Sequence, residues 1–267
     1  MTTRVRALIT KDWLELLQNR TAMIPIFIVP LVFVVIIPTM FFVLMNNDVL
    51  RAGINGVDMF MRTFPTELLP AGVGPEEQML YAMVMYFMAP MFLIIPVMIA
   101  TIVASSSFVG EKERRTLEGL LYTPLSNREL AFGKIAASFI PAVGFTWACF
   151  LVYAVLVNAL GYSRLGVFFP SAQWVLSMAL IVPLIAFVAI AATVAVSQRA
   201  KTMQGAQGAA TFFVLLILGL VVSQSAGVLL FNITVVLIAA GILALAAVIM
   251  FFLVVSRFSR ERMLLNL

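Results

Sequence analysis

Long uncharged apolar runs alternate with short charged segments along this 267-residue chain. A helix needs roughly 20 apolar residues to cross the hydrocarbon core of a bilayer. Six runs without any charged residue reach that length, and we number them spans 1 to 6: Thr21–Met45, Met79–Val109, Ile135–Leu160, Ala172–Ser197, Thr202–Ser225 and Gly227–Ser256. Only the region at Ala226–Gly227 separates spans 5 and 6. A short re-entrant or interfacial piece over Gly227–Asn232 would fit this region as well as a direct start of span 6 does. The pattern predicts an all-α membrane protein with six transmembrane helices and a single transmembrane domain over residues 1–267.

The segment before span 1 has a different pattern. Between Arg4 and Arg20, apolar residues recur with the helical period of 3.6, and Lys11, Glu15 and Gln18 lie opposite them. The apolar residues of this stripe are Val5, Leu8, Ile9, Trp13, Leu16 and Leu17. The pattern predicts an N-terminal amphipathic helix in the inner membrane interface, with its basic side chains near phosphate and one indole ring at headgroup level. The predicted interface residues are Arg4, Arg6, Lys11, Trp13 and Arg20. The alternative is an ordinary cytoplasmic helix packed on protein.

The composition fits a membrane protein with little chain outside the spans. Hydrophobic residues make up 63% of the chain and charged residues 11%, which leaves no room for a soluble catalytic domain. The net charge is +5, but the basic runs are short and alternate with Glu, so nucleic-acid binding is not expected. In a membrane protein a basic excess reports topology instead.

The distribution of Lys and Arg predicts which way the spans run. With six spans, fourteen of the 17 basic residues fall on one side, and only Arg51, Arg62 and Arg164 on the other. Because basic loops stay in the cytoplasm, both termini and residues 110–134 are predicted to be cytoplasmic. Residues 46–78 then form the main outer loop.

The sequence argues against an enzyme. The chain has no His, its one cysteine is Cys149 in an apolar run, and no span contains Asp. These absences exclude His-dependent zinc sites, His bases and intramembrane Asp pairs, and no metal-binding cluster is visible. There is no Walker A pattern for ATP binding, and no cofactor is expected in this chain.

Residues 110–134, which we call the charged module, hold nine of the chain's 29 charged residues. A helix is predicted from Glu111 to Leu121, with a pair from Glu111 to Arg114 or Arg115 and an end at Pro124. Ser126 and Glu129 then form a capping box that opens a second helix leading into span 3. A helix–turn–helix with charges and a leucine ridge suits docking into a partner's groove. A solvated loop is the alternative.

Uncharged polar residues also occur inside the spans, and a small-residue patch opens span 5. They provide either hydrogen bonds between helices or the lining of a pathway. The polar positions include Thr101, Ser105, Ser106, Ser107, Thr146, Asn158, Gln173, Thr193, Gln204 and Gln207, and the patch is formed by Gly205, Ala206, Gly208, Ala209 and Ala210.

The charged module resembles the segment between the second and third spans of type-2 ABC exporter permeases. The matching pieces are the acidic-basic run from Glu111, the T-L-E of Thr116–Glu118, the T-P-L-S of Thr123–Ser126, and Gly133-Lys134. The layout of six spans with cytoplasmic ends is similar over the whole chain. A large outer domain between the fifth and sixth spans, present in some members, is not matched here.

The resemblance implies a coupling helix over Glu111–Thr123 in the groove of a separately encoded ATPase, which would bind ATP and Mg²⁺. It implies a transporter of two permeases and two ATPases in the plasma membrane, and a bacterial inner membrane is the expected location. The docking residues that it implies are Glu111, Lys112, Glu113, Arg114, Arg115, Thr116, Leu117, Glu118, Leu120, Leu121, Thr123 and Pro124.

The spans are mainly Phe, Met, Leu and Val, which favours an amphipathic or apolar cargo such as a drug, peptide or lipid-like molecule. Two other functions stay open. An ion-coupled transporter normally carries ionisable residues within its spans, and none of the six runs has one. A membrane scaffold or sensor that holds a signalling partner is excluded less firmly.

Overall fold

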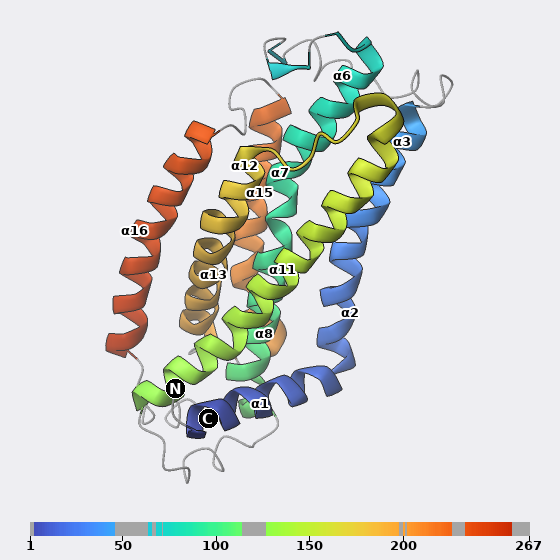
Figure 1. Ribbon diagram of the computed structural model, residues 1–267. Coiled ribbons are helices and arrows are strands. Elements are labelled where there is room, and N and C mark those ends of the chain that lie inside the picture. The colour runs from blue at the N-terminus through green and yellow to red at the C-terminus, as the bar shows by residue number, and fades with distance from the viewer. Residues whose placement is uncertain are drawn as a thin grey trace.

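The computed structural model describes residues 3–45, 64–65, 68–70, 72–113, 127–197, 200, 202–225 and 233–257. Every regular element in these ranges is a helix (Figure 1). Six helices are long and apolar enough to cross a membrane: Arg20–Met45, Pro75–Phe108, Glu129–Leu165, Ala172–Ser197, Met203–Ser223 and Ile233–Leu253. Each overlaps one predicted span, so the predicted all-α architecture with six spans is confirmed.

Several spans are built from consecutive helical pieces. The elements are α1 (Thr3–Gln18); in span 1, α2 (Arg20–Pro30), η1 (Leu31–Ile36) and α3 (Ile37–Met45); in span 2, α6 (Pro75–Ala82), η3 (Met83–Phe87), α7 (Met88–Phe92) and α8 (Ile94–Phe108); then α9 (Gly110–Glu113); in span 3, α11 (Asn127–Leu165); in span 4, α12 (Ala172–Leu176), η4 (Ser177–Ile181) and α13 (Val182–Ser197); in span 5, α14 (Met203–Ala206) and α15 (Gly208–Ser225); and in span 6, α16 (Ile233–Arg257).

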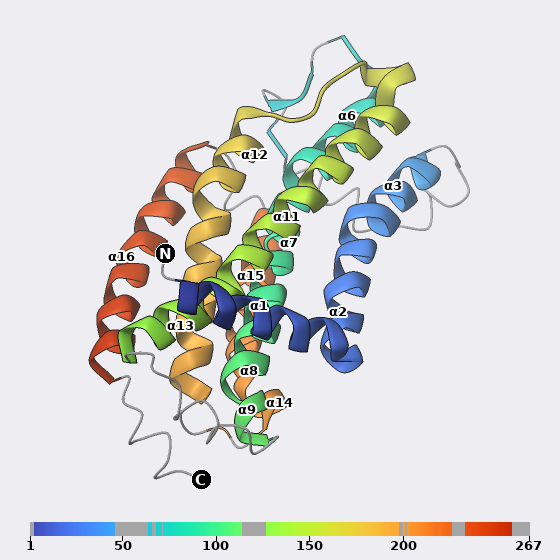
Figure 2. The ribbon, with the colours of Figure 1, turned by 60° about the horizontal axis from the view of Figure 1, so that its bottom comes forward.

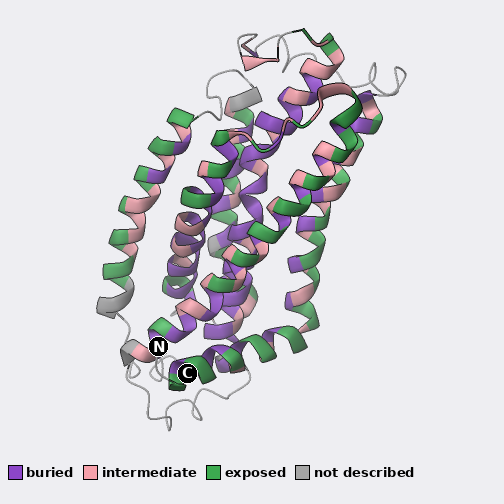
Figure 3. Cartoon of the chain, in the orientation of Figure 1, coloured by how far each residue is buried: buried purple, intermediate pink, exposed green. Residues whose placement is uncertain are grey.

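Span 2 is the central helix of the bundle. Its most apolar window is 83% buried, whereas that of span 6 is only 11% buried. Helix α8 packs against α2, α11, α13 and α15, and Figure 3 shows the buried positions concentrated along this axis. The outer faces of the surrounding spans carry exposed Leu, Ile, Val and Phe side chains, as expected of surfaces that meet lipid tails.

Helix α1 lies across one end of the bundle and turns sharply into α2 (Figures 1 and 2). Asn19 caps the start of α2, and its side chain accepts a hydrogen bond from the Ala22 amide at 3.3 Å. The buried face of α1 packs on α11, while Trp13, Leu14 and Leu17 are exposed. Leu17 therefore lies outside the buried stripe that its spacing suggested. Contact between the outer face of α1 and lipid stays a prediction.

Three segments of the described residues are π-helical, and each ends two or three residues before a proline: η1 before Pro38, η3 before Pro90 and η4 before Pro183. Proline lacks the backbone N–H that continues a helical hydrogen-bond ladder. A local π turn is one known way to accommodate an irregularity in a helix. Pro38, Pro90 and Pro183 thus lie next to the discontinuities of spans 1, 2 and 4.

Several predicted features fall outside the described residues. These are residues 46–63 of the outer loop, the module from Arg114 to Ser126, and the piece between spans 5 and 6 at Gly227–Asn232. The flanks of the module are described. The short helix α9 begins at Gly110, and α11 begins at Asn127, where the sequence predicted a second helix.

Candidate functional site

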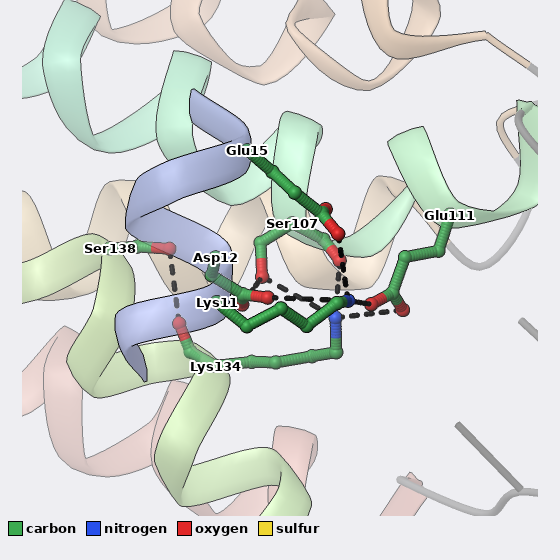
Figure 4. A network of polar contacts seen from close by, with 7 residues as sticks. All are labelled: Lys11, Asp12, Glu15, Ser107, Glu111, Lys134 and Ser138. Carbon is green, nitrogen blue, oxygen red and sulfur yellow. Dashed lines mark hydrogen bonds and ion pairs between the residues drawn. The ribbon is translucent and has the colours of Figure 1, made fainter. Parts of the chain in front are cut away.

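Two charged residues at the two ends of the charged module, Glu111 and Lys134, are buried where α1, α8 and α11 meet (Figure 4). Glu111, at the start of α9, has a 2% exposed side chain and binds two ammonium groups. Its Oε1 lies 2.7 Å from Lys11 Nζ, and its Oε2 lies 2.9 Å from Lys134 Nζ. One carboxylate thus joins α1 to α11.

The lysine of span 3 is the most enclosed charge of the cluster. Lys134 is 1% exposed, and its ammonium donates to the backbone carbonyl of Ser107 as well as to Glu111. The same ammonium lies 5.4 Å from the centre of the Phe108 ring, a cation–π distance. The end of span 2 and the start of span 3 are therefore held by one fully engaged ammonium group.

Asp12 brings a third carboxylate into the cluster. Its Oδ2 accepts a hydrogen bond of 2.5 Å from the Ser107 hydroxyl, while its buried Oδ1 has no hydrogen-bond partner. Burial raises the pKa of the Asp12 carboxyl, and the opposing effects of Lys134 and the Ser107 hydroxyl do not cancel this rise. We name Lys11, Asp12, Ser107, Glu111 and Lys134 the ion cluster.

Lys11 sits at the outer edge of the ion cluster, with a side chain that is 40% exposed. Burial by itself lowers the pKa of its ammonium, but the hydrogen bond and charge of Glu111, with smaller contributions from Asp12 and Glu15, raise it overall. Glu15 lies 3.2 Å from Lys11 Nζ, one helical turn along α1. Lys11 is therefore charged at neutral pH and serves as the exposed edge of the cluster.

A glycine lets α1 approach α11 closely enough to form these bonds. A Cβ atom at Gly133 would lie only 2.7 Å from Leu8 Cδ2 of α1. Gly133 and Lys134 are the G-K pair of the charged module. The structure assigns the first of them to close helix contact and the second to the ion cluster.

The structure differs from the sequence-based picture at two residues. Glu111 was expected to present its charge to a partner, and it is instead buried inside the chain. Lys11 was expected near lipid phosphate, and its ammonium instead binds Glu111. Both differences arise because α1 folds onto the ends of spans 2 and 3, which brings opposite charges together.

The other predicted site residues are placed as follows. Arg4, Arg6 and Arg20 are exposed on α1 and at the start of α2, and the Trp13 indole donates to Ala137 O at 2.8 Å. Lys112 and Glu113 belong to α9, but their side chains are not described. The remaining docking residues, from Arg114 to Pro124, lie outside the described residues.

Sequence reasoning missed Asp12. It named Ser107 only as one of the polar residues of span 2, and it read Lys134 only as a topology marker and part of the module. Asp12 did carry a signal, because it stands four residues from both Leu8 and Leu16 on the stripe that α1 buries. A carboxylate on a buried stripe requires a partner. Nothing in the local sequence pairs Ser107 with Asp12, or Lys134 with Glu111.

A second polar feature is a cavity of about 390 Å³ between α8 and span 5. Its walls combine amides and hydroxyls with apolar side chains, and none of its lining residues is charged: Met98, Thr101, Ile102, Gln204, Gln207, Gly208, Ala210, Thr211 and Val214. Gln207 Nε2 also donates to Ser105 Oγ at 3.3 Å. Three of the polar positions and two of the small residues that the sequence singled out therefore meet around one cavity.

Other polar positions serve the helices themselves. Thr146 and Thr193 donate to carbonyls one turn earlier in their own helices, at 2.6 and 2.8 Å. Asn158 bonds the backbone of Phe168 and Phe169, in the connection between spans 3 and 4. These residues therefore form hydrogen bonds that stabilise the helices and their connection.

The raised pKa of Asp12 gives a pH-dependent prediction. The folded chain binds this proton more tightly than the unfolded chain, so the stabilisation is complete below the usual carboxyl pKa of about 3.9 and is lost as the pH rises through the raised value. Asp12→Asn keeps the shape without the buried charge. Its melting temperature should therefore match the parent near pH 4 and exceed it at pH 7 to 8, measured by circular dichroism in detergent.

Glu15→Gln provides the control, because Glu15 is a partly exposed carboxylate one turn further along α1. Its effect on the melting temperature should change much less between pH 4 and 8. An Asp12→Asn variant that is less stable than the parent at pH 7 would show that the ionised form is the stabilising one.

Comparison with known proteins identifies the family of this chain. A family model described as ABC-2 family transporter protein matches residues 6–236. Searches of curated proteins and of solved structures returned no match. The matched range contains most of α1, the ion cluster, the charged module and five of the six spans. The chain thus belongs to the ABC-2 transporter family, as a membrane-spanning permease.

Proposed function

We propose that the chain is the permease of an ATP-driven exporter and works through a separate ATPase that docks on the charged module. The observation that carries the proposal is the ion cluster. Glu111 stands at the first turn of the module, and its carboxylate is bonded to α1 and to span 3. A displacement of the module would therefore pull on α1 and span 3 through these bonds, and on span 2, which directly precedes the module in the chain.

Docking would use the part of the module beyond Glu111. Lys112, Glu113 and the charged and leucine residues from Arg114 to Leu121 combine charge with an apolar ridge. The partner ATPase would bind ATP and Mg²⁺, for which this chain has no Walker A motif. Two copies of each subunit would form the complete transporter, with the cargo pathway between the permeases.

The cavity between α8 and span 5 supports a cargo with an uncharged polar part and an apolar part. Its hydroxyls and amides offer hydrogen bonds without charge, and Met98, Ile102 and Val214 offer apolar contact. An amphipathic cargo such as a drug, peptide or lipid-like molecule fits this lining. An inorganic ion would gain no charged ligand from these residues.

We place α1, the ion cluster and the charged module on the cytoplasmic side of the plasma membrane. The membrane that we propose is a bacterial inner membrane. The excess of basic residues at this end supports the orientation. Trp13, Leu14 and Leu17 form the exposed apolar edge of α1, flanked by Arg6 and Arg20. This arrangement suits an interfacial helix that faces lipid headgroups.

The orientation predicts the accessibility of the outer loop. Single cysteines placed in residues 46–78 should react with a membrane-impermeant maleimide on intact cells. The native Cys149 is buried within span 3 and serves as the internal blank. Cysteines placed in residues 114–126 should react only after permeabilisation. Labelling in the opposite order would overturn the topology.

The direct test of the function is to isolate the tagged chain in mild detergent and identify what accompanies it. An ATPase with a Walker A motif is expected in about equal amount. The scaffold or sensor alternative predicts a signalling partner without that motif.

A further inference from the structure

All three tryptophans of the chain make the same kind of contact. Each indole N–H donates to a backbone carbonyl of another helix. The bonds run from Trp13 to Ala137 O at 2.8 Å, from Trp147 to Met178 O at 3.0 Å and from Trp174 to Met85 O at 2.8 Å. We call these the three indole bonds. Their environments differ widely, since Trp174 is 1% exposed and Trp147 is 48% exposed.

The accepting carbonyls share a position relative to proline. Ala137 precedes Pro141 by four residues within the continuous helix α11. In an α-helix the carbonyl of residue 137 would receive the N–H of residue 141, and proline has none. The Trp13 indole therefore supplies the donor that Pro141 cannot provide.

In span 4 the same relation holds with π spacing. The Val182 N–H donates to Ser177 O, five residues back. The next bond in that register would run from residue 183 to Met178 O, and residue 183 is proline. The carbonyl left without a helical donor is the one that the Trp147 indole reaches.

Span 2 repeats this arrangement. The Met88 N–H donates to Met83 O, again five residues back. Two steps further in this register, Pro90 would face Met85 O. Met85 O instead accepts from the Trp174 indole, and from Gln173 Nε2 at 3.3 Å. The neighbouring Val84 O accepts from the Tyr153 hydroxyl at 2.9 Å.

A backbone carbonyl without a donor is costly in a bilayer, where no water can replace it. We propose that the three tryptophans are positioning residues, each of which replaces a hydrogen-bond donor removed by a proline in a neighbouring helix. The bonds link α1 to span 3, span 3 to span 4, and span 4 to span 2. They thereby fix the irregular points of three spans and hold these spans and α1 as one unit.

A double-mutant cycle on purified chain in detergent tests the proposal. Trp147→Phe removes the donor and retains an aromatic ring, and the exposure of this side chain makes folding of the variant tolerant of its loss. The melting temperature, measured by far-ultraviolet circular dichroism, should fall by about 2–6 °C, which is the range expected for one unsatisfied carbonyl. In a Pro183→Ala background, where the backbone regains an N–H, the same substitution should change the melting temperature by less than about 1 °C.

A mismatched pair provides the control. Trp147→Phe should cost as much in a Pro141→Ala background as in the parent, because Pro141 belongs to the bond of Trp13. The matched cycle of Trp13→Phe and Pro141→Ala repeats the test at a second site. An equal loss in matched and mismatched backgrounds, or no loss in either, would show that the indoles serve only as packing and would overturn the proposal. Neither ATPase nor cargo is needed, so the result is independent of the proposed transport function.

Discussion

Replacement of Lys134 by Met should destabilise the folded chain by about 3–5 kcal/mol, the usual cost of removing one partner of a buried ion pair. The ammonium of Lys134 is enclosed and bonds both Glu111 and Ser107. Without it, the buried carboxylates of Glu111 and Asp12 would lose the enclosed cation that lies between them, and the nearby Lys11 is partly exposed. The free energy of unfolding in mixed detergent micelles measures the effect.

Two variants give this prediction its controls. At the opposite end of the bundle, Arg164 lies 3.8 Å from both Glu76 and Glu77 and is 31% exposed. Arg164→Met should therefore cost less than about 1 kcal/mol. Adding Glu111→Gln to Lys134→Met should recover much of the loss, because the second change removes one of the two buried carboxylate charges. Equal losses for Lys134→Met and Arg164→Met would mean that the ion cluster is not a buried network.

The second large effect concerns transport. The double variant Arg115→Ala, Leu117→Ala should lower ATP-dependent transport at least about tenfold, because truncating one or two central contact residues of an interface commonly costs more than 1.4 kcal/mol. The folding of the spans should be unchanged, since neither residue belongs to a span. Transport is measured with vesicles that contain the chain and its ATPase, and folding is measured as the melting temperature of the chain alone. The two measurements separate an effect on coupling from an effect on folding.

The structure also shows which residue should not be used for this test. Glu111 stands in the same module, but it belongs to the ion cluster, so its replacement would disturb folding and docking together. A matched control is Arg260→Ala, Leu264→Ala in the C-terminal tail, which removes one charge and one leucine outside the module. Full coupled transport by the Arg115 and Leu117 variant would count against docking through the module.

The spans and their order could be predicted because the length of an apolar run is a local property. Each of the six predicted runs coincides with a long helix. The start of α11 at Asn127 agrees with the predicted start of the second helix of the module. The helices extend beyond the runs where polar residues continue the ladder. Span 3, for example, reaches from Glu129 to Leu165 and so includes Lys134.

The ion cluster could not be predicted, because its bonds join residues far apart in the chain. Ser107 and Asp12 are 95 positions apart, and Lys11 and Glu111 are 100 positions apart. Nothing in the local pattern says that α1 folds back onto the ends of spans 2 and 3. Charge counting placed Lys11, Glu111 and Lys134 on one side of the membrane, but only tertiary packing pairs them.

The indole bonds show the same limit for uncharged groups. The prolines were visible in the sequence, and so was the loss of a backbone donor at each one. The donor that replaces it comes from a residue 124 positions away for Trp13 and 89 for Trp174. Sequence alone therefore shows where a backbone donor is lost, and it does not show which side chain replaces that donor.

The measurement that tests the central claim most directly is the isolation of the tagged chain from native membranes in mild detergent, with mass spectrometry of the accompanying proteins. We expect an ATPase that carries a Walker A motif, in about equal amount with the chain, and its loss from the Arg115→Ala, Leu117→Ala variant. Recovery of the chain without any ATPase from several detergents would contradict the proposal that ATP hydrolysis in a docked partner drives this permease.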